Sequence, residues 1–108
     1  MNDEHPSERD NIPPDEINAI FRRLRQLKAS FGRKPNMDRV GVALIGACIT
    51  EGFDRSDRII GALVKLALNR MHVGQLLRRH DEDGAGPPYW RLEADGRYRL
   101  LDAALAAS

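Results

Sequence analysis

Three histidines and one cysteine are the residues of this chain best suited to metal or nucleophilic chemistry, but their spacing favours neither. His72 and His80 are eight residues apart on one predicted helix, too far apart for a helical metal pair. Cys48 lies in an apolar run with no partner at a useful spacing, so we interpret it as a small core residue. Four glycines lie singly within predicted helices, where close packing explains them better than a phosphate-binding loop: Gly41, Gly46, Gly61 and Gly74. The sequence therefore predicts no enzyme, no metal site and no cofactor.

Basic side chains are the second group that could do chemistry, and they occur in blocks. The net charge is +1, but residues 1–16 sum to −5, residues 17–36 to +6 and residues 70–80 to +3. Fourteen of the 17 basic residues are arginines, whose planar guanidinium groups suit forked contacts with phosphates and guanines. Because the placement of basic blocks matters more than the total charge, this pattern favours a polyanionic partner.

The third basic block lies in the second of two short predicted helices. The first helix is expected to end near Ala67 and the second to begin near Arg70, with Asn69 as its N-cap. So short a connection makes the two helices cross steeply and share their apolar faces. The apolar positions recur at helical spacing, as Ile59, Ile60, Leu63 and Leu66 and then as Val73, Leu76, Leu77 and His80.

The helix from Arg70 to His80 is predicted to turn a polar face to solvent. Arg70 and Gln75 lie in its N-terminal half and have the donor geometry that reads guanine and adenine in the major groove. Arg78 and Arg79 lie later in the helix and are expected to contact phosphates. The alternative interpretation is a solvated polar face on a core helix, and it accounts for each residue taken singly.

Residues 90–100 are predicted to form a β-hairpin with the three-residue loop Ala94-Asp95-Gly96 and Gly96 in the left-handed conformation. This register buries the apolar side chains on one shared face. Two arginines directly opposed on the other face repel each other by a few tenths to ~1 kcal/mol, which suits a hairpin lying along a phosphate backbone better than a scaffold. The predicted pairs are Trp90–Leu100 and Leu92–Tyr98 on the apolar face, and Arg91–Arg99 and Glu93–Arg97 on the basic face.

The hydrophobic order LxLNRxxVxxLL, followed by this hairpin, resembles a winged helix-turn-helix DNA-binding domain over roughly residues 38–101. The resemblance implies that the second helix enters the major groove and that the hairpin is the wing. Ala67 stands where the family often has glycine, and Leu63 where such proteins usually keep a small alanine. The predicted DNA-binding residues are Asn69, Arg70, Met71, His72, Gln75, Arg78, Arg79, Arg91, Arg97 and Arg99.

The chain divides into four predicted segments around this unit. They are an acidic disordered tail at 1–12, an amphipathic helix at 13–34, the winged helix-turn-helix domain at 36–101 and a C-terminal tail at 102–108. Within the domain, Asn36 or Asp38 is expected to cap a helix that stops at Gly52 and is buried, because it is apolar nearly all round. Asp54 or Ser56 is expected to cap the following helix.

The apolar stripe of the amphipathic helix allows two interpretations. It can cover the core of its own chain, or it can form a homodimer, since symmetric DNA sites favour two-fold proteins. The residues concerned are Ile17, Ile20, Phe21, Leu24 and Leu27.

The sequence thus predicts a mainly α fold with a small β-hairpin: a winged helix-turn-helix domain plus an N-terminal amphipathic helix. No apolar run is long enough to cross a membrane and no leader is recognised, so a cytoplasmic location is expected. The predicted function is sequence-specific binding of double-stranded DNA by a small transcriptional regulator. The alternative is a winged-helix adaptor for a protein partner, which the acidic tail and the acidic residues 81–83 favour. No ligand pocket is predicted for a chain of 108 residues.

Overall fold

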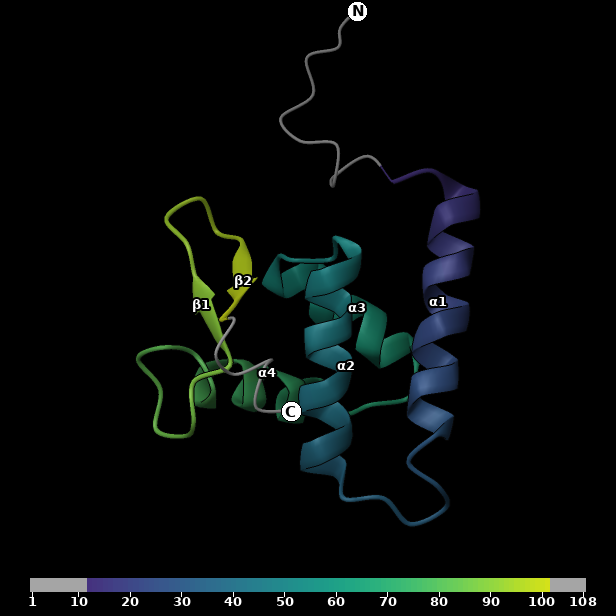
Figure 1. The fold of residues 1–108 in the computed structure, drawn as a ribbon, viewed down its shortest axis with the longest axis horizontal. Coiled ribbons are helices and arrows are strands. Elements are labelled where there is room, and N and C mark those ends of the chain that lie inside the picture. Colours follow the sequence, from purple (N-terminus) through teal and green to yellow (C-terminus); the bar gives the residue numbers. More distant parts are fainter. Residues whose placement is uncertain (1–11, 102–108) are drawn as a thin grey trace, which may run out of the picture.

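A computed structural model of the chain describes residues 12–101, and these residues fold into helices followed by one antiparallel hairpin (Figure 1). The predicted C-terminal tail and residues 1–11 of the predicted N-terminal tail lie outside the described residues. No described helix combines the length and the apolar character that a membrane span requires. The elements are α1 (Pro14–Ala29), α2 (Met37–Glu51), α3 (Ser56–Lys65), α4 (Arg70–Arg79), β1 (Trp90–Leu92) and β2 (Tyr98–Leu100).

Helix α2 is the central element, and α1, α3, α4 and the hairpin surround it (Figure 1). Its ends follow from local chemistry. The side chain of Asn36 accepts hydrogen bonds from the backbone N–H groups of Asp38 and Arg39, which makes Asn36 rather than Asp38 the N-cap. Gly52 ends the helix with a left-handed φ of 104°, a conformation that costs other residues free energy.

One side of α2 is buried as predicted, but the other side is not. Cys48 lies in the core with Leu44 and Ile45, and burial raises the pKa of its thiol to about 12. Its burial confirms the prediction that Cys48 is a core residue. The prediction of a helix buried all round was wrong, because a second stripe is only half-buried: Val42, Ala43, Gly46 and Ala47.

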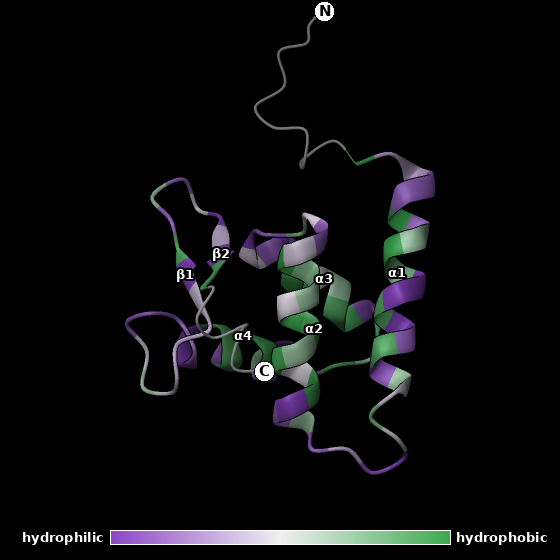
Figure 2. Ribbon diagram, viewed as in Figure 1, coloured by the Kyte–Doolittle hydropathy of each residue, from purple (hydrophilic) through white to green (hydrophobic). Residues whose placement is uncertain are grey.

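Helix α1 lies along α2 and covers the core of its own chain (Figures 1 and 2). Ile20 and Leu24 are each 1% exposed, whereas Ile17, Phe21 and Leu27 are half-buried. Ile20 and Leu24 therefore pack within their own chain, and a homodimer through the rest of the stripe stays a prediction. The helix ends at Ala29, earlier than predicted, because Gly32 adopts a φ of 88° in the turn that follows.

A forked ion pair joins the solvent-facing sides of α1 and α2. Arg23 Nε and Nη2 bond the two carboxylate oxygens of Glu51 at 2.6 and 2.8 Å. The hydrogen bonds from Arg23 lower the pKa of Glu51 below its ordinary value. The pair links α1 to the C-terminal end of α2.

The hairpin has the predicted register, with Trp90 opposite Leu100, Arg91 opposite Arg99 and Leu92 opposite Tyr98. Gly96 closes the loop with a φ of 87°, as the loop type requires. The apolar face is buried only in part. Trp90 and Tyr98 are core residues, but Leu92 is 50% exposed.

The connection between α2 and α3 differs from the prediction. Neither Asp54 nor Ser56 caps α3; Arg55 occupies the N-cap position and makes no side-chain cap. Instead the connection is extended and lies beside β2. Arg55 forms an antiparallel bridge with Arg97, and the N–H of Tyr98 donates to the carbonyl oxygen of Asp54 at 2.6 Å. This third extended segment escaped the sequence reasoning because it is too short to show alternation.

Candidate nucleic-acid interface on helix α4 and the hairpin

The turn between α3 and α4 sets the orientation of α4. Ala67 has a φ of 71°, a left-handed conformation that is strained for a residue with a β-carbon. On either side of it, Leu66 and Leu68 are buried, and the N–H of Leu68 donates to the carbonyl oxygen of Leu63 at 3.0 Å. Burial of the two leucines holds the turn in place despite the strain at Ala67.

Helix α4 is seated on α2 through a close contact between the two helices. A β-carbon at Gly41 would overlap Cδ1 of Leu76, the end of a flexible side chain, so the glycine leaves room for Leu76 where the two helices meet. The indole N–H of Trp90 donates to the carbonyl oxygen of Leu77 at 2.9 Å and joins the hairpin to the same helix. Close packing explains Gly41 but not Gly61, which has no neighbour within 4 Å of such a carbon.

The solvent face of α4 is polar, as predicted. Asn69 caps the helix by accepting from the N–H of His72 at 2.9 Å. Met71 is 70% exposed beside this cap, an unusual exposure for an apolar side chain. The other exposed predicted residues of the helix are Arg70, Gln75, Arg78 and Arg79.

His72 is the exception on this face. Its Nε2 lies 2.7 Å from Oδ1 of Asp38 in the first turn of α2, and its side chain is 28% exposed. The ring is therefore engaged within the chain and supports the contact between α2 and α4. His80, by contrast, is buried, with Nδ1 bonded to the carbonyl oxygen of Pro87 at 2.8 Å.

The basic face of the hairpin is partly neutralised by acids of the same chain. Arg91 and Arg99 are exposed side by side, but Arg91 Nε lies 3.4 Å from Glu82 and its Nη1 lies 3.9 Å from Glu93. The acidic loop thus compensates the exposed face of β1.

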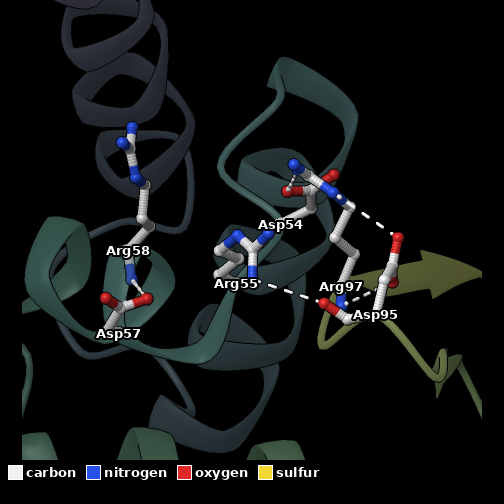
Figure 3. Close-up of polar contacts among 6 residues, drawn as sticks. All are labelled: Asp54, Arg55, Asp57, Arg58, Asp95 and Arg97. Atoms are coloured by element: carbon white, nitrogen blue, oxygen red, sulfur yellow. Dashed lines mark hydrogen bonds and ion pairs between the residues drawn. The ribbon is translucent and has the colours of Figure 1, made fainter. Parts of the chain in front are cut away.

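Arg97 does not lie on the exposed basic face, contrary to the prediction. Its side chain is 14% exposed, and its Nη1 bonds Oδ1 of Asp54 at 3.0 Å, where Asp54 is 1% exposed (Figure 3). Arg55 reaches the hairpin loop from the same connection, donating to the carbonyl oxygen of Asp95 at 3.4 Å. These contacts tie the loop of the hairpin to the segment between α2 and α3, so Arg97 anchors the hairpin.

A pocket of about 810 Å³ adjoins this surface, between α2, the end of α4 and the hairpin. No pocket was predicted from the sequence, where its one sign is the apolar character of α2 on both sides. The described residues contain no cluster of three or more potential metal ligands.

Comparison of the chain with protein-family models, with curated proteins and with solved structures returned no match.

Proposed function

We propose that the chain binds double-stranded DNA in a sequence-specific manner, as the winged helix-turn-helix unit of a small transcriptional regulator. The observation that carries the proposal is the placement of α4. Its apolar side is seated on α2 and α3, the arginines and Gln75 of its polar side are exposed, and the hairpin stands beside it. The element order of helix, extended segment, two helices and hairpin, with the extended segment bridged to the residue before β2, supports the same fold.

In this proposal the residues divide by role. Arg70, Met71 and Gln75, next to the capped N-terminus of α4, contact base edges. Arg78 and Arg79 on α4 and Arg91 and Arg99 on the hairpin contact phosphates. Arg97 and His72 hold the two elements in position through Asp54 and Asp38.

Fluorescence anisotropy of a labelled duplex, titrated with the protein at several salt concentrations, tests the proposal. We expect affinity to fall by orders of magnitude between roughly 50 and 200 mM salt, because several phosphates are neutralised. Arg99→Ala should reduce the slope of log K against log salt by about 0.9, and Arg22→Ala on the far helix α1 is the matched control. Absence of binding at the lowest salt concentration would refute the proposal.

Base readout needs a second measurement. Arg70→Ala and Gln75→Ala should reduce discrimination among sequences selected from a random duplex pool, with losses of about 1–3 kcal/mol for each preferred base. If the selected sequences are the same for both variants and the parent, α4 is not the reading element.

A protein-binding adaptor is the second candidate function. The pairing of Arg91 with Glu82 and Glu93, and of Arg97 with Asp54, leaves the hairpin less basic than its composition suggests. An adaptor would show no salt-dependent affinity for the duplex, and its partner would bind equally well to Arg70→Ala and Gln75→Ala.

A further inference from the structure

The pocket beside the hairpin has walls of two kinds. One wall is the half-buried side of α2, where Ala43, Gly46 and Ala47 leave the helix surface without large side chains. Another wall is aromatic: the Tyr89 ring is stacked on His80 with ring centroids 4.7 Å apart, and Trp90 adjoins both. A volume of about 810 Å³ is within the range of small-molecule sites, which are largely apolar with a few polar groups.

The polar groups of this pocket carry net positive charge. Arg39, in the first turn of α2, and Arg79, in the last turn of α4, both line it. Gly86 in the loop after α4 packs closely against the Arg79 side chain: a β-carbon at Gly86 would lie 2.9 Å from Cγ of Arg79. The loop therefore restricts the direction that the Arg79 side chain takes. Asp38 also lines the pocket, but its carboxylate holds His72 at 2.7 Å. Within residues 12–101, neither of these two arginines forms an ion pair.

We infer that this pocket binds a small organic anion that has a rigid apolar body and a single carboxylate head group. The apolar body lies between the small residues of α2 and the rings of Tyr89 and Trp90. The carboxylate accepts hydrogen bonds from Arg39 and Arg79, which supply the charge complementarity that the apolar walls lack. The inference does not depend on DNA binding, because the binding of such an anion is measured on the protein alone.

Three probes that share one apolar body and differ in head group test this inference on the full chain. They are adamantane-1-carboxylate, adamantane-1-carboxamide and 1-adamantylammonium, none of which absorbs where tryptophan is excited. Trp90 is the only tryptophan and lines the pocket, so its fluorescence reports binding at this place. We expect saturable binding in the order carboxylate, carboxamide, ammonium, with about a tenfold loss from the first to the second. Equal affinity for all three probes, or no saturable signal in either fluorescence or calorimetry, would overturn the inference.

Substitutions locate the head group. Arg39→Gln and Arg79→Gln should each weaken binding of the carboxylate by about tenfold and leave the carboxamide unchanged. Arg22→Gln on α1 removes the same charge far from the pocket and should change neither. If the carboxylate binds the Arg39 and Arg79 variants as tightly as the parent, the assignment is wrong.

The chain's own C-terminal residues are the competing occupant. Leu105 is the one large apolar residue within 102–108, the segment that follows the described residues. If adamantane-1-carboxylate binds only after Leu105→Asp, the pocket is filled by the chain itself, and this result would overturn the inference. Binding to the parent and to this variant with equal affinity supports it.

Discussion

Helix α4 and the hairpin each carry three arginines, but the two sets differ in exposure and in ion pairing. Those of α4 are exposed and form no ion pair within residues 12–101: Arg70, Arg78 and Arg79. On the hairpin, Arg97 is bonded to the buried Asp54 and Arg91 is paired with Glu82, while Arg99 is exposed. Arginine content alone therefore does not measure how much basic surface a polyanion can reach. The acids paired with Arg91 and Arg97 come partly from the hairpin itself, as Glu93 and Asp95, and partly from outside it, as Glu82 and Asp54.

The largest expected effect is the difference in stability between loss of the anchoring Arg97 and loss of the exposed Arg99. Arg97→Ala should lower the free energy of unfolding by about 2–4 kcal/mol, because Asp54 loses a charged partner while buried. Arg99→Ala should change it by less than about 0.5 kcal/mol, as expected for an exposed side chain. Urea denaturation of both variants measures the difference, and equal effects would remove the distinction between anchoring and exposed arginines.

The next effect concerns the seat of α4. Gly41→Ala should destabilise the chain by about 1 kcal/mol, since the added methyl group overlaps Cδ1 of the buried Leu76 and forces that side chain out of its rotamer. Gly61→Ala is the matched control on α3. It has open space around it and should stabilise the chain by about 0.5–1 kcal/mol through helix propensity. Thermal unfolding distinguishes the two, and a stabilising Gly41→Ala would show that the helices are not in close contact.

A smaller gain is expected in the turn that orients α4. Ala67→Gly should stabilise the chain by about 0.5–1 kcal/mol, because relief of the strain at a φ of 71° exceeds the added backbone entropy of glycine. Ala43→Gly, at a helical position of α2, should instead cost about 0.5–1 kcal/mol. A loss of stability in both variants would contradict a left-handed residue 67.

The smallest expected effect tests whether an arginine of the hairpin can be released from its ion pair, as the arginines of α4 already are. Glu82→Gln releases Arg91 from a surface pair worth about 0.2–1 kcal/mol, so duplex affinity should rise by about two- to fourfold. Asp83→Asn removes the same charge from the neighbouring residue, for which no ion pair is found in the described part of the chain, and controls for net charge. If the two variants raise affinity equally in the anisotropy assay, the pairing of Arg91 with Glu82 does not limit the hairpin.

The parts of the fold that were predicted correctly rest on interactions between near neighbours. Asn36 and Asn69 cap helices by hydrogen bonds to N–H groups two or three residues away, and Gly52 and Gly96 supply left-handed conformations at their own positions. The hairpin register followed from alternation over eleven residues, closed by a loop whose glycine fixes the pairing. For the candidate site, the same local reasoning identified the polar face of α4.

The tertiary structure alone decided which predicted residues are accessible. Arg97 meets Asp54 across 43 positions of sequence, and Arg91 meets an acid of the preceding loop; neither pairing has a local signal. In the same way, the second side of α2 was predicted to be buried because it is apolar. In the folded chain it borders a pocket, since the hairpin and the end of α4 do not cover it. Sequence determines caps and periodicity because these involve hydrogen bonds and side chains within a few residues. Accessibility depends on which distant element packs nearby, and only the folded chain sets that.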